Sequence, residues 1–448
     1  MRKTKDAYTE FIKSKAKSDE MFGFEPISLG EDMFPFQRHL TEWSIRKGRC
    51  SLFEDCGLGK TYQEEVWADN VVRHENKAVL ILTPLAVGPQ MVKEGEKFGI
   101  EVRQIKDCKV WKKGINVCNY ERLHLLDPDD WAGVVCDESG ILKHSTSKTR
   151  NRVNAFLSRV KYRLLATATP SPNDFVELGN SSEVLGVMGY QQMLGMFFSN
   201  GGEDTQSWVL KGHAKKRFWR WVCTWARALR KPSDLGYSDD GFVLPELKVV
   251  QHVVKSPEPE FGFGLDEAAT LDDQRIERKA TLRERCEKVA EIVPKKDFCV
   301  VWCHLNSEGV LLERLIPGSV QVAGKDEEKE ERFAAFAAGQ IKTLITKPKM
   351  GGWGLNWQHC NRMTTFPSHS YESFYQSIRR CWRFGQKRPV TVDVVSSRAE
   401  SRVVRGMDRK ERQMNEMFSS LVSAMNEYQL DGKKQSNEEL KLRFPKWL

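Results

Sequence analysis

Short apolar runs alternate with longer amphipathic stretches in two parts of the chain. In the first part the apolar runs lie at 50–53, 78–83, 115–120, 132–138 and 162–169. Runs of this length, separated by helical patterns, are typical of a parallel sheet that helices cover on both faces. A second set lies at 298–303, 319–324, 341–346, 361–366 and 390–395. Two such sets predict an α/β fold with two lobes, each built on a mostly parallel sheet.

The alternation lapses between the two sets, where glycine-rich turns and a basic, tryptophan-rich run follow one another. The run at 211–231 has eight Lys and Arg residues, four aromatic residues and no acid. Contact with DNA and packing as a helix with a basic outer face both remain open for it, because Phe218, Trp221 and Trp225 also repeat at helical spacing.

These patterns divide the chain into five expected parts. They are an N-terminal extension at 1–33, a first lobe at 34–175, a helical insertion and linker at 176–256, a second lobe at 257–398 and a C-terminal helical brace at 399–448.

Composition favours a globular protein with an anionic partner. The 448 residues are 40% hydrophobic and 29% charged, with a formal net charge of +9. Eleven cysteines without a CxxC pair favour free thiols over disulfides or a zinc site. The charged N-terminus lacks the apolar core of a signal peptide, and no run of about 18 apolar residues appears. We therefore expect a cytoplasmic location and no membrane partner.

A phosphate-binding loop is the first candidate for chemistry. The sequence "CGLGKT" places a glycine turn, Lys60 and Thr61 between an apolar run and a helical pattern. Backbone N–H groups of such a turn cradle phosphates, with Lys60 on the β and γ oxygens and Thr61 on Mg²⁺. The strict Walker A pattern has Gly where Glu54 stands, so a glycine turn that merely joins strand and helix is the alternative.

Two adjacent carboxylates close the run at 132–138. Ligands bind at the carboxyl ends of strands in such sheets, so Asp137 is expected to hold Mg²⁺, largely through water, and Glu138 to orient and deprotonate a water molecule. Thr167 and Thr169 end a later apolar run, where their hydroxyls could relay to moving parts. Taken alone, an Asp-Glu pair at a strand end more often begins a solvated loop.

Two further groups complete a nucleotide site. The Gln37 amide could pair with an edge of adenine, beside Phe34 and Phe36 for stacking. Arg380 and Arg383 are three residues apart, so on a helix they project from one face toward a single phosphate. A basic patch that binds any polyanion is the simpler interpretation of these arginines.

In this order, the motifs resemble the helicase superfamily 2 motors. They look most like Swi/Snf-type DNA translocases in the compact DEAD/DEAH-like versions of phages and prophages. The likeness spans roughly residues 34–396 and rests on "GLGKT", "DESGILKHSTSK", "RLLATATPSPND", "MGGWGLNW" and "QSIRRCWRFGQKRPVTV". The arginine motif with the pattern RxxRxGQ is the most specific of them.

The resemblance implies two RecA-like lobes with ATP and Mg²⁺ in the cleft between them. Catalytic residues would be Lys60, Asp137, Glu138, Arg380 and Arg383, the two arginines reaching across as fingers. Nucleotide-binding residues would be Gln37, Gly57, Gly59, Lys60, Thr61, Gly354 and Gln376, and the Mg²⁺ residues Thr61 and Asp137. Segments around Pro84, Tyr120, Lys349 and Trp353 would follow the nucleic-acid backbone. Arg379, Lys387 and Arg388 are expected to make surface or backbone contacts.

Two departures from the family pattern stand out. Gly140 occupies the position that is usually His in "DEAH", so the link between the carboxylates and the hydroxyls is expected either to differ or to be made by His144. The stretch 368–372, "SHSYE", replaces the family's "DWNP" element. Histone-reading modules are missing from the sequence, which argues against chromatin as substrate.

The predicted function is an ATP-dependent DNA translocase or helicase that favours duplex DNA and serves phage replication or recombination. Two alternatives stay open: an RNA helicase of the same superfamily, and a nucleotide-gated DNA-binding or assembly protein with little motor activity. We expect a monomeric core in the host cytoplasm, working beside replication or recombination proteins.

Overall fold

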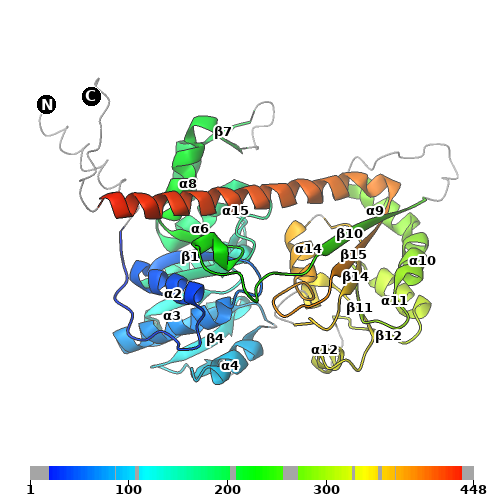
Figure 1. Cartoon of the computed structure of the whole chain (residues 1–448), viewed down its shortest axis with the longest axis horizontal. Coiled ribbons are helices and arrows are strands. Elements are labelled where there is room, and N and C mark those ends of the chain that lie inside the picture. Colours follow the sequence, from blue (N-terminus) through cyan, green and yellow to red (C-terminus); the bar gives the residue numbers. More distant parts are fainter. Residues whose placement is uncertain are drawn as a thin grey trace, which may run out of the picture.

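A computed structural model describes residues 20–85, 87–105, 110–201, 208–255, 271–324, 328–351, 356–368 and 370–435. Two lobes lie next to each other, and one long helix, α15 (Ser401–Gln435), runs across both (Figure 1). This arrangement confirms the prediction of two α/β lobes.

The first lobe is built on a parallel sheet with the strand order β3-β4-β2-β5-β6-β1-β9. Its strands are β1 (Arg49–Glu54), β2 (Val79–Thr83), β3 (Val102–Gln104), β4 (Ile115–Asn119), β5 (Gly133–Cys136), β6 (Tyr162–Thr167) and β9 (Ala226–Leu229). Every residue of β2, β5 and β6 is buried, as expected for strands that helices cover on both faces.

Helices of the first lobe pack on both faces of this sheet. On one face Phe36, Trp67 and Met91 form a core with strand residues such as Ile81. The helices that supply these residues are α2 (Pro35–Lys47), α3 (Lys60–Glu75) and α4 (Gly88–Lys97). Against the other face lie α5 (Lys148–Leu157), α6 (Leu178–Leu185), α7 (Tyr190–Phe197) and α8 (Lys215–Cys223). Short 3-10 helices include η2 (Tyr120–Leu125), η4 (Ser139–Leu142) and η8 (Arg398–Glu400).

The second lobe repeats this plan with the parallel strand order β10-β15-β14-β11-β13-β12. Its strands are β10 (Leu247–Val254), β11 (Cys299–Trp302), β12 (Ser319–Gln321), β13 (Thr343–Thr346), β14 (Arg362–Thr365) and β15 (Val390–Ser397). Its helices are α9 (Leu271–Ala280), α10 (Leu282–Ile292), α11 (Asn306–Leu315), α12 (Lys329–Ala337), α13 (Pro348–Gly351) and α14 (Tyr371–Ile378).

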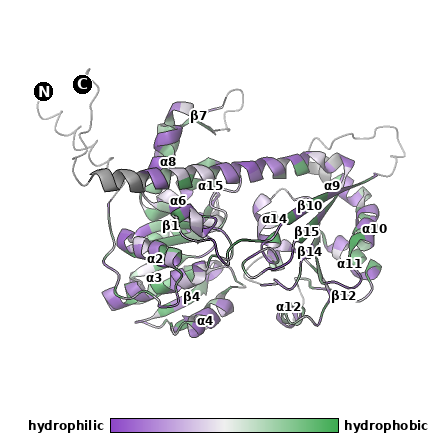
Figure 2. Cartoon of the chain, in the orientation of Figure 1, coloured by the Kyte–Doolittle hydropathy of each residue, from purple (hydrophilic) through white to green (hydrophobic). Residues whose placement is uncertain are grey.

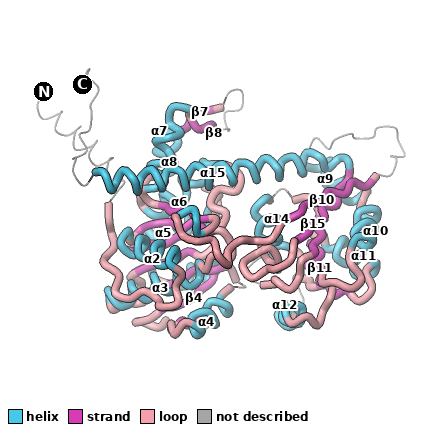
Figure 3. Tube along the Cα trace, in the orientation of Figure 1, coloured by secondary structure: helices cyan, strands magenta, loops and turns pink. Residues whose placement is uncertain are grey.

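The stretch 176–256, expected to be a helical insertion and linker, contributes an outer strand to each sheet. Its β9 pairs with β1, and its β10 pairs with β15 along its whole length. The aromatic side chains Phe218, Trp221 and Trp225 are buried in the first lobe. The structure therefore favours packing over stacking on DNA for these aromatics. A small antiparallel pair, β7 (Phe198–Asn200) and β8 (Trp208–Leu210), projects beyond α15 (Figure 3).

Helix α15 joins the cores of the two lobes. Met417, Leu421 and Met425 belong to the apolar cluster of the first lobe, whereas Met407 lies at the second lobe, where its sulfur accepts a hydrogen bond from the Ser368 N–H group at 3.4 Å. Figure 2 shows the apolar residues concentrated in the sheets and mixed with polar ones along α15. Among the described helices, none has the length and apolar character that crossing a membrane requires.

Candidate active site between the lobes

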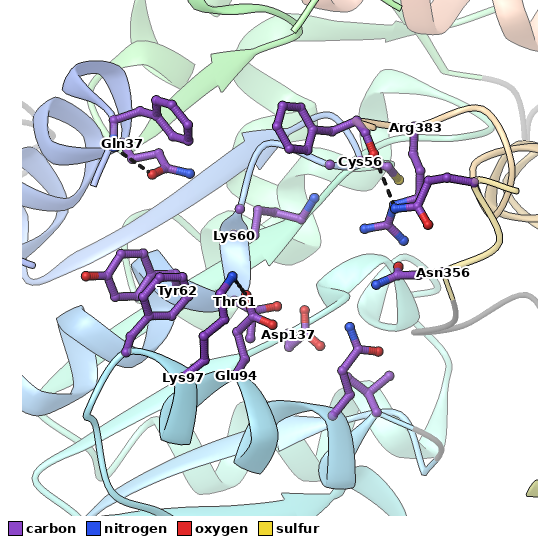
Figure 4. A pocket seen from close by; sticks show the side chains of 18 of the residues that line it. Gln37, Cys56, Lys60, Thr61, Tyr62, Glu94, Lys97, Asp137, Asn356 and Arg383 are labelled. Carbon is purple, nitrogen blue, oxygen red and sulfur yellow. Dashed lines mark hydrogen bonds and ion pairs between the residues drawn. The ribbon is translucent and has the colours of Figure 1, made fainter. Parts of the chain in front are cut away.

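A cavity of about 360 Å³ lies where the two lobes meet. The predicted residues that line it are Gln37, Gly57, Gly59, Lys60, Thr61, Asp137, Glu138, Arg380 and Arg383. Asn356 of the second lobe lines it as well. Figure 4 shows Gln37 and Arg383 at opposite sides of the pocket, with Lys60, Thr61 and Asp137 between them. The fold thus brings together side chains that are more than three hundred residues apart in sequence.

The glycine turn after β1 has the conformation that a phosphate loop needs. Gly57 and Gly59 have φ angles of 89° and 81°, in the left-handed region that favours glycine. Helix α3 begins at Lys60, so its first N–H groups face the cavity side of the turn. The Lys60 ammonium donates to the main-chain oxygens of Glu54 at 2.8 Å and Asp55 at 3.2 Å, which holds it beside the place where phosphates would bind.

Glu54, which stands where the strict Walker A pattern has glycine, has a structural role. Its side chain is buried and accepts a hydrogen bond from Gln63 Nε2 at 2.8 Å, which ties the end of β1 to α3. Burial raises the pKa of Glu54 to about 7. The side chain at this position therefore braces the loop from behind, and the turn that faces the cavity keeps its glycines.

The carboxylates of Asp137 and Glu138 follow β5, as predicted. Glu138 has a φ angle of 49°, a left-handed conformation that is strained for a residue with a side chain and is often found at functional sites. Burial raises the pKa of both carboxylates, Glu138 adds to the rise at Asp137, and Lys60 opposes it at both. The protein thus concentrates negative charge at this point, where a cation would relieve it.

An oxygen donor set suited to Mg²⁺ is present at the same point. The Thr61 hydroxyl and the Asp137 carboxylate both line the cavity, and Mg²⁺ prefers hard oxygen ligands supplemented by water and substrate phosphates. In the described part of the chain no His, Cys, Asp and Glu residues form a cluster of three or more able to hold a metal. These residues fit an ion that is held by few protein groups and completed by the nucleotide.

The second lobe contributes the predicted arginines through α14 and the turn after it. Arg380 is buried and donates from Nη2 to the Gln376 side-chain oxygen at 3.0 Å. Burial lowers the pKa of Arg380 and of Arg383, and the positive charges of Arg380 and Arg379 lower the pKa of Arg383 further. Placing two cations in this small space is unfavourable by itself, and an anion in the cavity would offset that cost.

Gln376 was predicted to bind nucleotide, and it lies behind the cavity instead of among the lining residues. Its Nε2 group is 3.5 Å from Glu138 Oε2, and its oxygen accepts the Arg380 hydrogen bond. Gln376 therefore connects the Glu138 carboxylate of the first lobe with Arg380 of the second.

The Gln37 amide is held in place by hydrogen bonds at both ends. Its oxygen accepts from the Phe34 N–H group at 3.0 Å, and its nitrogen donates to the Leu58 carbonyl at 2.7 Å. Phe34 lines the cavity as expected, but Phe36 is buried in the core of the lobe. Sequence reasoning missed Phe242 and Phe384, which also line the cavity with ring centroids 4.9 Å apart.

The residues predicted to contact nucleic acid differ in how exposed they are. Pro84 follows β2 and is half-buried, and Lys349 is exposed on α13. Tyr120 is only 1% exposed, and its hydroxyl donates to the Asp137 carbonyl at 2.7 Å. The prediction of Tyr120 as a nucleic-acid contact is therefore wrong for its side chain, which supports the carboxylate turn. Trp353, together with Gly352 and Gly354, lies outside the described residues.

Arg379 was expected at the surface, and this expectation is also wrong. The side chain is buried, forms an ion pair with Asp55 and donates to the Cys56 carbonyl at 2.9 Å. Tyr375 donates a hydrogen bond to the same Asp55 carboxylate. Lys387 and Arg388 from the same motif are exposed, as expected.

The His144 alternative for the missing family histidine receives no support, because His144 is exposed. Thr169 instead donates from its hydroxyl to Glu372 at 3.3 Å, and Lys143 forms an ion pair with the same carboxylate. Sequence reasoning did not assign a role to Glu372 or Lys143.

Comparison with known proteins supports the resemblance seen in the motifs. No family model matches the sequence. The Bacillus subtilis protein named "Uncharacterized ATP-dependent helicase YqhH" is 24% identical over 417 residues, which cover 80% of this chain and 74% of that protein. The protein named "DNA annealing helicase and endonuclease ZRANB3" is 27% identical in Bos taurus over 177 residues, covering 35% of this chain and 16% of that protein.

A solved structure, "Sulfolobus solfataricus SWI2/SNF2 ATPase core in complex with dsDNA", is 18% identical and aligns over 84% of this chain and 90% of that chain with a TM-score of 0.43. The sequence relatives are named as helicases, and the one matched over most of this chain is named as ATP-dependent. These names agree with the resemblance to ATP-dependent helicases that the motifs carry.

Proposed function

We propose that this relative of the ATP-dependent helicases is an ATP-driven DNA translocase that hydrolyses ATP between its lobes and moves along DNA, preferably duplex DNA. One observation carries the proposal: a single cavity is lined by Lys60, Asp137 and Glu138 of the first lobe and by Arg380 and Arg383 of the second. A site divided in this way is complete only while the lobes are together, so its chemistry is linked to their relative motion.

Binding of the nucleotide begins at the glycine turn. Backbone N–H groups of the turn and of the first turn of α3 donate hydrogen bonds to the phosphate oxygens, and Lys60 exchanges its two main-chain oxygens for phosphate oxygens. Mg²⁺, when held by Thr61 and Asp137, would neutralise charge on the phosphates. Gln37, fixed at both ends of its amide, lies on the side of the pocket suited to the base.

Hydrolysis needs the second lobe. Glu138 orients the attacking water, and Gln376 keeps its carboxylate in place through the contact at 3.5 Å. Arg380 and Arg383 stabilise the charge that develops on the γ-phosphate, an effect worth on the order of 10³ to 10⁵ in rate for an arginine finger. Opening and closing of the lobes then moves their nucleic-acid surfaces past one another.

DNA is the favoured partner for two reasons. Relatives matched over part of this chain are named as DNA annealing helicases, and the net charge of +9 favours a polyanion. Pro84 and Lys349 are the described candidates for backbone contacts, since both are accessible. We further propose a role in phage replication or recombination, in the cytoplasm of the host.

ATPase rates with single-stranded DNA, duplex DNA, forked DNA and RNA test this proposal, with Glu138→Gln as the inactive control. We expect the strongest stimulation by duplex DNA and none in Glu138→Gln. Displacement of a triplex-forming strand from duplex DNA would then report movement. Stimulation by RNA alone would favour the RNA helicase alternative, and the absence of stimulation by any nucleic acid would contradict a motor.

A further inference from the structure

The two departures from the family sequence meet in space. Gly140 follows the catalytic carboxylates, and Glu372 ends the stretch that replaces the family's "DWNP" element. A Cβ atom added to Gly140 would lie 2.6 Å from Glu372 Oε1, closer than real Cβ contacts allow. The carboxylate of the second lobe therefore fills the space that a side chain at position 140 would need.

Glu372 is held there by two groups of the first lobe. Lys143 forms an ion pair with it, and the Thr169 hydroxyl donates to Oε1 at 3.3 Å. The side chains of Lys143 and Glu372 are 14% and 10% exposed, so the pair is largely removed from water. Breaking a pair of this kind leaves a charge without its partner, which costs far more than losing an ion pair at the surface.

One face of α14 connects this contact to the hydrolytic site. Glu372 and Gln376 are four residues apart on the helix, so they project from the same side. Gln376 approaches Glu138, while Glu372 reaches the turn that follows Glu138 and the Thr169 hydroxyl beyond it. A shift of α14 would thus disturb both contacts together.

We propose that Glu372 is a positioning residue for ATP hydrolysis. By binding Lys143 and Thr169 in the space left by Gly140, it fastens α14 to the catalytic turn and keeps Gln376 and the arginines aligned with Glu138 when the lobes close. This inference rests on the proposed function, because it assigns Glu372 a part in ATP hydrolysis at Glu138.

The two residues must then depend on each other. Gly140→Ala should damage the wild type by pushing the Glu372 carboxylate away. In a Glu372→Ala background the closest clash disappears and only Thr169 remains near the new methyl group, at 3.2 and 3.3 Å. The same Gly140→Ala change should therefore cost less there, a non-additivity that independent structural damage would not produce.

The experiment measures basal and DNA-stimulated ATPase activity, together with the affinity for a fluorescent ATP analogue, for Glu372→Gln, Glu372→Ala, Gly140→Ala and the double variant. Lys143→Met removes the same ion pair from the other lobe and keeps the test valid if a Glu372 variant fails to fold. Glu331→Gln, an exposed carboxylate on α12, is the matched control.

We expect kcat to fall by on the order of tenfold to a hundredfold in Glu372→Ala and Lys143→Met, with ATP affinity changed by less than about twofold. Wild-type kcat in both of these variants would overturn the inference, and so would equal effects of Gly140→Ala in the two backgrounds. A wild type with basal activity but no stimulation by nucleic acid would contradict the proposed function alone, since basal kcat still tests Glu372.

Discussion

Arg379 and Asp55 form an ion pair across the two lobes, with 2.6 Å between Arg379 Nη2 and Asp55 Oδ2. Burial alone would lower the pKa of Arg379, but Asp55 and the nearby Tyr375 raise it. The pair lies directly behind the glycine turn, because Arg379 also bonds the Cys56 carbonyl. Contact between the lobes is thus built into the support of the phosphate loop.

Arg379→Ala should weaken this contact strongly, since it leaves the largely buried Asp55 carboxylate without its cation. We expect a loss of about 3 kcal/mol in the free energy of unfolding, measured by urea titration, together with reduced ATP affinity. Arg388→Ala, at an exposed position of the same motif, should stay within about 0.5 kcal/mol of wild type. Equal stability of the two variants would contradict an interlobe role for Arg379.

Arg383→Ala should separate binding from chemistry. The guanidinium lines the cavity from the second lobe, so its loss should remove most of the turnover while ATP still binds the first lobe. Equilibrium binding of a fluorescent ATP analogue and single-turnover hydrolysis measure the two quantities. Lys387→Ala, which is exposed, should instead weaken DNA binding in a salt-dependent manner. Loss of ATP affinity with normal hydrolysis of what remains bound would refute the finger assignment.

Glu65 should make the stability of the folded protein depend on pH. Its side chain is fully buried on α3, neither carboxylate oxygen has a hydrogen-bond partner among the described residues, and burial, with Glu94 adding, raises its pKa to about 9. Between its ordinary pKa of 4.5 and this value the native state keeps a proton that the unfolded state has lost. The contribution of Glu65 to the free energy of unfolding is therefore largest below the ordinary pKa of 4.5. It falls by about 1.4 kcal/mol per pH unit between that value and about 9.

Glu65→Gln stays neutral and should remove this slope. We expect its melting temperature to exceed that of wild type by a margin that grows from about pH 5 to about pH 8. Glu96→Gln, at an exposed position on α4, should follow the wild-type curve. A constant margin for Glu65→Gln over this range would show that Glu65 titrates normally.

Trp225→Ala should destabilise the first lobe. The indole is fully buried, with ring centroids 6.0 Å from Phe53 and 5.5 Å from Trp221, so truncation leaves a large cavity. We expect a loss of about 3–5 kcal/mol in the free energy of unfolding and unchanged DNA affinity of the folded protein. Arg217→Ala, on the exposed side of α8, should change stability by less than about 0.5 kcal/mol. A stable Trp225→Ala variant with weakened DNA binding would revive the stacking interpretation.

Most of the two sheets could be predicted because their strands are short, continuous apolar runs. Among the strands that the apolar runs did not predict, β9 contains Arg227, a buried residue whose guanidinium lies 4.2 Å from the Trp43 ring centroid. A charge that is covered by a partner distant in sequence gives no local signal of burial. Strand β10 lies at the edge of the second sheet, which explains why its residues are a mixture of half-buried and exposed ones.

The candidate catalytic residues could be proposed from sequence because their expected chemistry is tied to short motifs. Lys60, Asp137 and Arg383 each lie in a local pattern, and all three line one cavity. Arg379 and Glu372 could not be assigned in this way, because their roles depend on which side of α14 faces the first lobe. That orientation is decided by packing between the lobes, which no spacing within one motif encodes.

The methionines of α15 make the connection between the lobes sensitive to oxidation. Met417 and Met425 accept hydrogen bonds from the Ser171 hydroxyl and the Ala228 N–H group, at 3.0 and 3.2 Å, while Met407 contacts the second lobe. Thioethers repack easily when their neighbours shift, but the sulfoxide is polar and no longer suits an apolar core. Because these side chains are buried, an oxidant would reach them only when the helix lifts away. Sulfoxide formation at these positions would therefore report how often α15 separates from the lobes during turnover.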